Sequence, residues 1–289
     1  LQHIYKRGSW KRLCQLAGKI DDFATENEKA IVSAISKKWL STNSLSYFSF
    51  ILKIAKQNFK INILDFDENE KTMLLMLHYD IWQKEGGFSS LEESINQIGA
   101  NTILVEEIVE VLEILIEKID FMEIPIKLPY KMPLKLHARY TRDQILTAFE
   151  FSSFDKKSFA NEGAVENKNL NTEVLFINLI KSEENFSPTT MYNDYAVTDK
   201  QFHWQSQNQS RPDKGKGLSY IKHKSNNKKI LLFIREKPID EYGNRNGYVF
   251  IGEGSLKDYY GSKPISINWE LKEPMPHYLW KDAAKLSIG

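Results

Sequence analysis

Cysteine is nearly absent from this chain of 289 residues, since Cys14 is the only one. A single thiol excludes a disulfide framework and a zinc site built on cysteines, and it fits a reducing cytosol. The chain has no run of roughly eighteen apolar residues and no signal peptide, so we expect no membrane partner. Because the first residue is Leu1 and not methionine, we expect a fragment of a longer protein.

Catalytic and cofactor motifs are missing as well. The sequence DKGKGLSY at 213–220 lacks the spacing and the Lys-Ser/Thr ending of a phosphate-binding P-loop. No GxSxG sequence occurs, and Cys14 has no histidine at a recognisable spacing to activate it. His203, His223 and His277 do not follow a metal-ligand spacing. We therefore expect no catalytic residue, no bound metal and no cofactor in this fragment.

One pattern remains compatible with catalysis. Asp258 followed by Glu270 and Lys272 has the acid, then acid-x-lysine order of a metal-dependent nuclease, in which two carboxylates hold Mg²⁺. The pattern is short and arises often by chance. In a strand over PISINWELK, Glu270 and Lys272 also fall on the face opposite Ile267 and Trp269, where charged residues are ordinary solvent-facing side chains.

The first part of the chain is predicted to be helical. Asp67 and Glu70 have the spacing of a capping box ahead of an apolar periodic run. Apolar residues recur at helical spacing in four segments, 21–40, 44–59, 67–82 and 101–120. Prolines at 125, 129 and 133 then favour an extended linker. We place the domain boundary there, with a helical coupler segment at 1–134 and a second domain at 135–289.

The second domain is predicted to be rich in β-strands. One helix is expected at 141–149, where Thr141 and Gln144 have capping-box spacing, and another at 276–286. Strands are predicted at 173–180, 229–236, 247–254 and 264–272, with a hairpin turn in EYGNRNGY at 241–248. The fold class is therefore α+β: an all-helical segment, then a mixed β-rich domain with peripheral helices, in a small curled sheet or barrel.

The segment Ser187–Gln207, SPTTMYNDYAVTDKQFHWQSQ, has the chemistry of a base-binding pocket. Aromatic rings replace the stacking that a flipped nucleobase loses, and polar groups meet its Watson–Crick edge. Asp194 would accept a hydrogen bond from the exocyclic amine of cytosine, which thymine does not offer. The candidate base-binding residues are Tyr192, Asp194, Tyr195, His203, Trp204, Gln205 and Ser206. The alternative is that Tyr192, Tyr195 and Trp204 simply pack a sheet edge.

A basic segment follows this pocket. Between Arg211 and Lys229 the chain carries seven basic residues and one acid, Asp213. Such a run beside aromatic residues is typical of a polyanion site, although it also occurs as a solvated loop. The candidate contacts to DNA phosphates are Arg211, Lys214, Lys216, Lys222 and Lys224.

Residues 137–289 resemble a known family along several motifs: HARYTRDQILTAF, SPTTMYNDYAVTDKQFHWQSQ, GLSYIKHK, KILLFIRE and PISINWELKEPMP. They are similar to the C-terminal domain of bacterial superfamily 2 helicases that also carry a phospholipase D-type nuclease domain. Within that group the resemblance is to the target-recognition region of SauUSI-like type IV modification-dependent restriction endonucleases. These enzymes cut DNA containing 5-methylcytosine or 5-hydroxymethylcytosine in an ATP-dependent reaction.

The resemblance implies a non-catalytic recognition module of a cytoplasmic bacterial protein. Its partners would be double-stranded DNA containing modified cytosine and the helicase and nuclease domains of the same parent chain. By analogy of fold, it implies an SRA/PUA-like barrel that flips the modified base. Two alternatives stay open: a nuclease domain using Asp258, Glu270 and Lys272, and a protein-interaction module without DNA affinity.

Overall fold

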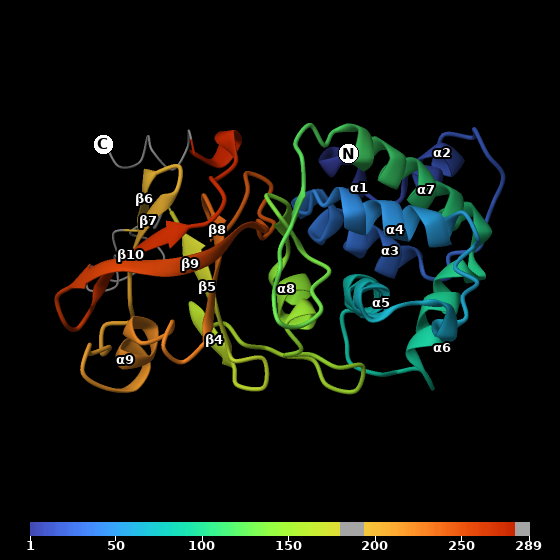
Figure 1. The fold of residues 1–289 in the computed structure, drawn as a ribbon. Coiled ribbons are helices and arrows are strands. Elements are labelled where there is room, and N and C mark those ends of the chain that lie inside the picture. The colour runs from blue at the N-terminus through green and yellow to red at the C-terminus, as the bar shows by residue number, and fades with distance from the viewer. Residues whose placement is uncertain (180–193, 281–289) are drawn as a thin grey trace. The chain divides into compact units, whose positions relative to one another are not determined.

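The computed structural model describes residues 1–179 and 194–280. The chain divides into two compact units, one of residues 1–159 and 241–247 and the other of residues 160–240 and 248–289. Helices occupy the N-terminal part and a large mixed sheet the C-terminal part, so the α+β class is confirmed (Figure 1). The boundary predicted at 134/135 comes earlier in the chain than this division by packing.

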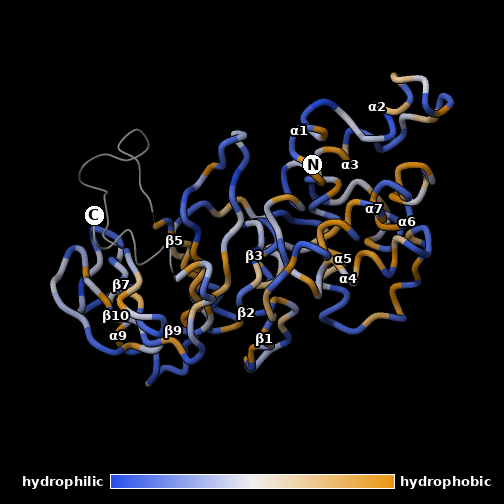
Figure 2. The backbone as a smooth tube through the Cα atoms, turned by 90° about the horizontal axis from the view of Figure 1, so that it is seen from above, coloured by the Kyte–Doolittle hydropathy of each residue, from blue (hydrophilic) through white to orange (hydrophobic). Residues whose placement is uncertain are grey.

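The first unit is a set of helices with short connections. Four are the predicted amphipathic ones: α3 (Glu28–Lys37), α4 (Leu45–Ala55), α5 (Glu68–Trp82) and α7 (Thr102–Glu117). The others are α1 (Gln2–Tyr5), α2 (Trp10–Leu16), α6 (Leu91–Asn96), α8 (Arg142–Ala148) and the 3₁₀ turns η1 (Trp39–Ser41), η2 (Ile63–Asp65) and η3 (Gln97–Ala100). Short strands β1 (Ile124–Pro125), β2 (Lys135–Leu136) and β3 (Arg139–Tyr140) lie near the prolines. Hydrophobic residues, orange in Figure 2, recur along α4, α5 and α7.

Both predicted capping boxes form. Asp67 and Glu70 cap α5, and Thr141 and Gln144 cap α8, each pair exchanging side-chain and backbone hydrogen bonds. The helix predicted from residue 21 begins only at Glu28, because Asn27 adopts a left-handed conformation with φ of 62°. No helix among the described residues is long and apolar enough to span a membrane.

A buried carboxylate organises the middle of this unit. Oδ2 of Asp80 accepts hydrogen bonds from Trp39 Nε1 at 3.1 Å, Tyr47 OH at 2.9 Å and Gln144 Nε2 at 2.8 Å. Its Oδ1 is buried without a hydrogen-bond partner within the described part. Three donors on one oxygen join η1, α4, α5 and α8, and burial raises the pKa of Asp80 to about 6.

The second unit is built on a twisted mixed sheet. Its strands are β4 (Ala164–Asn167), β5 (Thr172–Asn178), β6 (Tyr195–Thr198), β7 (Gln201–Gln205), β8 (Lys229–Arg235), β9 (Tyr248–Tyr260) and β10 (Ser266–Leu271). The spatial order is β4-β5-β8-β9-β10-β7-β6, in which β5 and β8 are parallel and the other pairs antiparallel (Figure 1). Helix α9 (Gly215–Ile221) lies in the crossover between β7 and β8.

β9 carries the curvature of this sheet. Its first half pairs with β8 and its second half with β10, and the register shifts by a bulge in each pairing. Bulges bend a strand and increase its twist, which lets one long strand serve both halves. β9 also lies close to β8 at Gly254, where a Cβ would come within 2.7 Å of Leu232 Cδ1.

The predicted barrel is not found among residues 1–179 and 194–280. Closure requires the first and last strands to pair, and the path ends instead at the four-residue strands β4 and β6. The hairpin at 241–248 is also not tight, because residues 241–247 belong to the first unit, where Ser41 Oγ donates to Arg245 O at 3.0 Å. The predicted C-terminal helix begins at 277, and residues 281–289 lie outside the described part.

Candidate nucleic-acid interface

The strands β6, β7, β10 and β9 place one row of polar and aromatic side chains across the sheet. Tyr195 pairs with His203, His203 with Asn268, and Asn268 with Asp258. Side chains alternate between the two faces of a strand, so this row lies opposite the core residues of β7 and β10. With Tyr260, two residues after Asp258 on β9, we call these residues the polar-aromatic row.

Hydrogen bonds fix the order of groups within the row. Asn268 Nδ2 donates to Asp258 Oδ1 at 2.5 Å, and His203 Nδ1 lies 2.8 Å from Asn268 Oδ1. A carboxylate only accepts, so the amide nitrogen of Asn268 faces Asp258 and its oxygen faces the imidazole. His203 Nδ1 is therefore the donor. When the ring is neutral, its Nε2 is left as a hydrogen-bond acceptor.

Three rings of the row are stacked. The His203 ring lies 4.8 Å from the Tyr195 ring and 6.0 Å from the Tyr260 ring, with interplanar angles of 27° and 24°. His203 is buried, whereas Tyr260 is 58% exposed. The stack therefore runs from a buried imidazole to a phenol ring that presents a face to solvent, the kind of surface on which a base stacks.

Trp204, the predicted stacking residue, faces the other way. It is 6% exposed and belongs to the core of the second unit. Its ring packs edge-on against Tyr220 of α9 at 5.2 Å and tilted against Trp269 of β10 at 6.3 Å. A ring used in this way holds the sheet to α9 and leaves no face for a base.

The other predicted base contacts mainly hold the ends of strands. Asp194 Oδ1 accepts from the backbone N–H of Gln205 at 2.9 Å. Ser206 is fully buried, and its Oγ accepts from Ile265 N at 2.9 Å. Gln205 Nε2 donates to Ser266 Oγ at 3.4 Å on the outer face. Tyr192 lies outside the described residues.

The predicted phosphate contacts divide into paired and unpaired cations. Arg211 binds Asp213 at 2.7 Å, and Lys216 Nζ lies 3.2 Å from Oε1 of the buried Glu173. Lys224 donates to the backbone carbonyl of Leu256 at 3.4 Å. Lys214 and Lys222 are exposed and form no ion pair with any residue of 1–179 or 194–280.

A buried ion pair anchors the basic segment to the sheet. Lys228 Nζ lies 2.8 Å from both Glu166 Oε1 and Glu173 Oε2 and donates to Ser219 Oγ at 3.0 Å. Burial alone would lower the pKa of Lys228, but its hydrogen bonds to the two glutamates outweigh burial and raise the pKa. Lys228 is thus a structural cation within a run of lysines, which sequence reasoning had no means to separate from its neighbours.

The groups of the alternative nuclease do not form a metal site in the described part. Asp258 and Glu270 project from β9 and β10 on the same face, but Asp258 is hydrogen-bonded to the Asn268 amide. Lys272 is exposed beyond the end of β10. Across residues 1–179 and 194–280, no three carboxylate, histidine or cysteine side chains gather closely enough to hold a metal ion.

Sequence reasoning missed Tyr260, Asn268 and Lys263. Asn268 could have been found, because the alternation in PISINWELK puts it on the same face as Glu270. Tyr260 and Lys263 depend on the β9–β10 hairpin, which the sequence did not predict. The backbone N–H of Lys263 donates to Ser210 O at 3.0 Å, which ties this hairpin to the loop that carries Arg211.

The chain was compared with curated proteins and with protein families. No curated protein matches the chain. The model of a family described as a domain of unknown function, DUF3427, matches residues 134–283, a segment that includes the polar-aromatic row and the basic segment. Since this match covers more than half of its 289 residues, the chain belongs to the DUF3427 family.

Proposed function

We propose that residues 135–289 form a non-catalytic DNA-recognition module that binds duplexes containing 5-methylcytosine or 5-hydroxymethylcytosine. The observation that carries the proposal is the exposed Tyr260 ring on a hairpin that is hydrogen-bonded to the loop leading into the basic segment. The hydrogen bond from Lys263 N to Ser210 O joins the two. Bases stack on exposed aromatic rings while lysine and arginine bind the flanking phosphates.

The polar-aromatic row supplies the polar groups that such a surface needs. His203 Nε2 is an acceptor in the neutral ring, and Asp258 and Asn268 continue the line of polar groups across β10 and β9. In this proposal the exposed Tyr260 ring contacts a base of the bound duplex, in place of Trp204. The duplex would then lie against the outer face of the sheet and not against its core.

The wider context in the proposal comes from the family. The DUF3427 family is found in helicase-associated proteins. We infer that the module serves as the recognition end of an ATP-dependent type IV restriction enzyme in the bacterial cytoplasm, with helicase and nuclease domains in the same parent chain. The helical segment 1–134 would couple recognition to the motor.

A binding titration of the whole chain tests the proposal. Matched duplexes with and without 5-methylcytosine are compared at two salt concentrations, since affinity for DNA depends steeply on salt. We expect tighter binding of the methylated duplex at both concentrations. Equal affinities at both would contradict recognition of the modification, and Mg²⁺-dependent cleavage abolished by Glu270→Ala would favour the nuclease instead.

Two tyrosines of one hairpin give a matched pair of variants. Tyr260 lies on the face of the polar-aromatic row, whereas Tyr259 pairs with Ile267 on the opposite face. Both rings are substantially exposed, at 58% and 44%. Tyr260→Ala should weaken DNA binding by about 1–3 kcal/mol, the size of one stacking contact, while Tyr259→Ala should leave it unchanged.

A further inference from the structure

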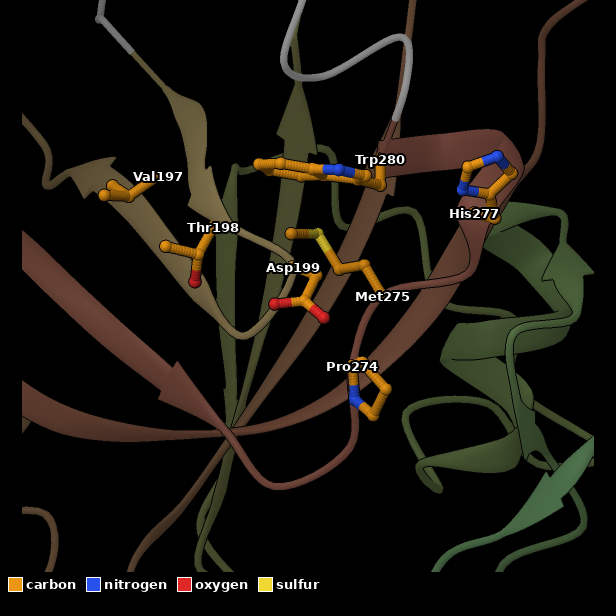
Figure 3. Close-up of a pocket in the computed structure, with 7 residues that line it drawn as sticks. All are labelled: Val197, Thr198, Asp199, Pro274, Met275, His277 and Trp280. Carbon is orange, nitrogen blue, oxygen red and sulfur yellow. The ribbon is translucent and has the colours of Figure 1, made fainter.

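A cleft of about 530 Å³ opens in the second unit, and none of its lining residues belongs to the polar-aromatic row. One side is the β6–β7 turn, with Val197, Thr198 and Asp199. The other side is the segment after β10, with Pro274, Met275, His277 and Trp280 (Figure 3). Every lining residue belongs to the second unit, and the family match covers all of them.

Backbone hydrogen bonds hold the two sides together. Met275 N donates to Asp199 O at 2.7 Å, and Leu271 N donates to Lys200 O at 2.8 Å. Within the turn, Lys200 N donates to Thr198 Oγ1 at 3.2 Å. On the other side, Trp280 N donates to Pro276 O at 3.0 Å, which makes Trp280 part of a helical turn. The width of the cleft is therefore fixed by main-chain contacts.

The lining combines an aromatic plane, an apolar floor and one carboxylate. The Trp280 ring lies over the side chain of Met275, and the Asp199 carboxylate projects between Met275 and Pro274 (Figure 3). Within residues 1–179 and 194–280, the Asp199 carboxylate has no hydrogen bond or ion pair. Val197, 43% exposed, adds a further apolar side chain to the lining.

These groups select for a flat ring that carries an amine. An indole face attracts planar rings, and a carboxylate accepts hydrogen bonds but cannot donate them, so it favours an amino group over a carbonyl. Pockets of roughly 300–1,000 Å³ hold ring-sized molecules, whereas a lone ammonium group would fill only a small part of such a cleft. A methyl group on the ring would contact Met275 and Val197.

We propose that this cleft is a binding site for an aminopyrimidine ring, with Trp280 as its stacking plane and Asp199 as the acceptor for its exocyclic amine. The ring would be a cytosine turned out of a DNA duplex. That identity rests on the proposed function, whereas binding of the free ring does not. The cleft, and not the cluster around Trp204, would then receive the base.

Two nucleosides that differ at one position test the site directly. 5-Methyl-2′-deoxycytidine and thymidine share the C5 methyl group, but the first has an amine where the second has a carbonyl. Each is titrated into the whole chain, and the indole N–H resonance of Trp280, assigned by its loss in Trp280→Leu, is followed by NMR. We expect about tenfold tighter binding of the cytidine, the size of one hydrogen bond to a charged group.

Asp199→Asn supplies the decisive variant, because the amide can donate to the thymidine carbonyl and has nearly the same shape. It should abolish or reverse the preference, while Asp120→Asn, an exposed site in the first unit, should preserve it. Equal binding of the two nucleosides, an unchanged preference in Asp199→Asn, or tighter binding of propylammonium than of the cytidine would each overturn the site.

Duplex titrations separate the two proposals. If the nucleosides bind as expected but the chain does not bind DNA, the cleft is a binding site for the ring and the proposed function is wrong. If Trp280→Leu, which removes the stacking plane, loses the preference for the methylated duplex while binding to both duplexes persists, the cleft is the reader of the base. A preference for methylated DNA that survives in Trp280→Leu would refute the identity of the ring as the target base.

Discussion

His203 Nδ1 lies 2.8 Å from Asn268 Oδ1, and the same asparagine donates to Asp258 from its other amide atom. Asp258 fixes the orientation of the Asn268 amide, and the amide oxygen in turn accepts a hydrogen bond from the His203 ring. The tautomer of His203 on β7 is therefore set by Asp258 on β9, through Asn268. This relationship has a direct spectroscopic consequence.

The neutral His203 ring should carry its proton on Nδ1. Asn268 offers only an oxygen to the ring while its nitrogen is held by Asp258, so the Nδ1–H tautomer keeps the hydrogen bond and the other loses it. Long-range ¹H–¹⁵N correlation spectra distinguish the two forms. In Asn268→Leu the constraint is removed, and we expect a mixture of tautomers. An Nε2–H ring in the unaltered chain would contradict the assigned orientation of Asn268.

Lys228 and Glu173 should be strongly coupled. Their side chains are 3% and 0% exposed, so removing one partner leaves a buried, unpaired charge. Lys228→Met or Glu173→Leu alone should each lower the free energy of unfolding by about 3–5 kcal/mol, and the double variant should recover most of that loss. Urea unfolding of the four proteins gives the coupling energy. If the losses in free energy of unfolding of the two single variants simply add in the double variant, Lys228 and Glu173 are not coupled.

The parts of the fold that the sequence predicts are those fixed by local chemistry. Asp67 with Glu70 and Thr141 with Gln144 satisfy the first backbone donors of their own helices, so nothing distant is needed to recognise α5 and α8. The strands β5, β8, β9 and β10 can likewise be recognised in the sequence, because burial makes each of them an apolar run.

The candidate site was harder to predict because it depends on register between distant strands. Trp204 was assigned to a pocket for its chemistry, but one step of alternation decides whether a strand residue faces the core or the outer face. The structure shows which face Trp204 is on, because Trp204 pairs with Ile267 of β10. Thr172 pairs with Lys229 in the parallel β5–β8 ladder, a contact that no local pattern encodes.

Asp80 and His78, both on α5, should give opposite dependences of stability on pH. Burial raises the pKa of Asp80 from 3.8 to about 6. Between those values the folded chain holds a proton that the unfolded chain has released, so stability falls as pH rises. Burial lowers the pKa of His78 from 6.5 to about 4, so stability falls as pH drops through that range. Each contribution is roughly 3 kcal/mol, and they largely cancel between about pH 4 and pH 6.

Single variants should separate these two contributions. Asp80→Asn leaves His78 unopposed, so its stability should fall more steeply than that of the unaltered chain when the pH is lowered from about 6 to about 4. His78→Gln should show the reverse and gain stability over the same range. Urea midpoints at several pH values measure both effects. Curves of Asp80→Asn that run parallel to those of the unaltered chain would show that Asp80 does not titrate in this range.

The salt dependence of DNA binding should distinguish Lys222 from Arg211. Lys222 is exposed and has no ion pair with any described residue, so Lys222→Ala should remove about one phosphate contact and flatten the slope of log affinity against log salt by about 1. Arg211 is held by Asp213 at 2.7 Å, and an arginine that is already neutralised releases little counterion. Asp213→Ala should therefore strengthen DNA binding and steepen the slope, because it frees Arg211 for phosphate.

Lys168, an exposed lysine in the β4–β5 turn, gives the matched control for loss of one charge, Lys168→Ala. If Lys168→Ala and Lys222→Ala flatten the slope equally, the effect reports net charge alone, and the basic segment is not the surface that meets the phosphates.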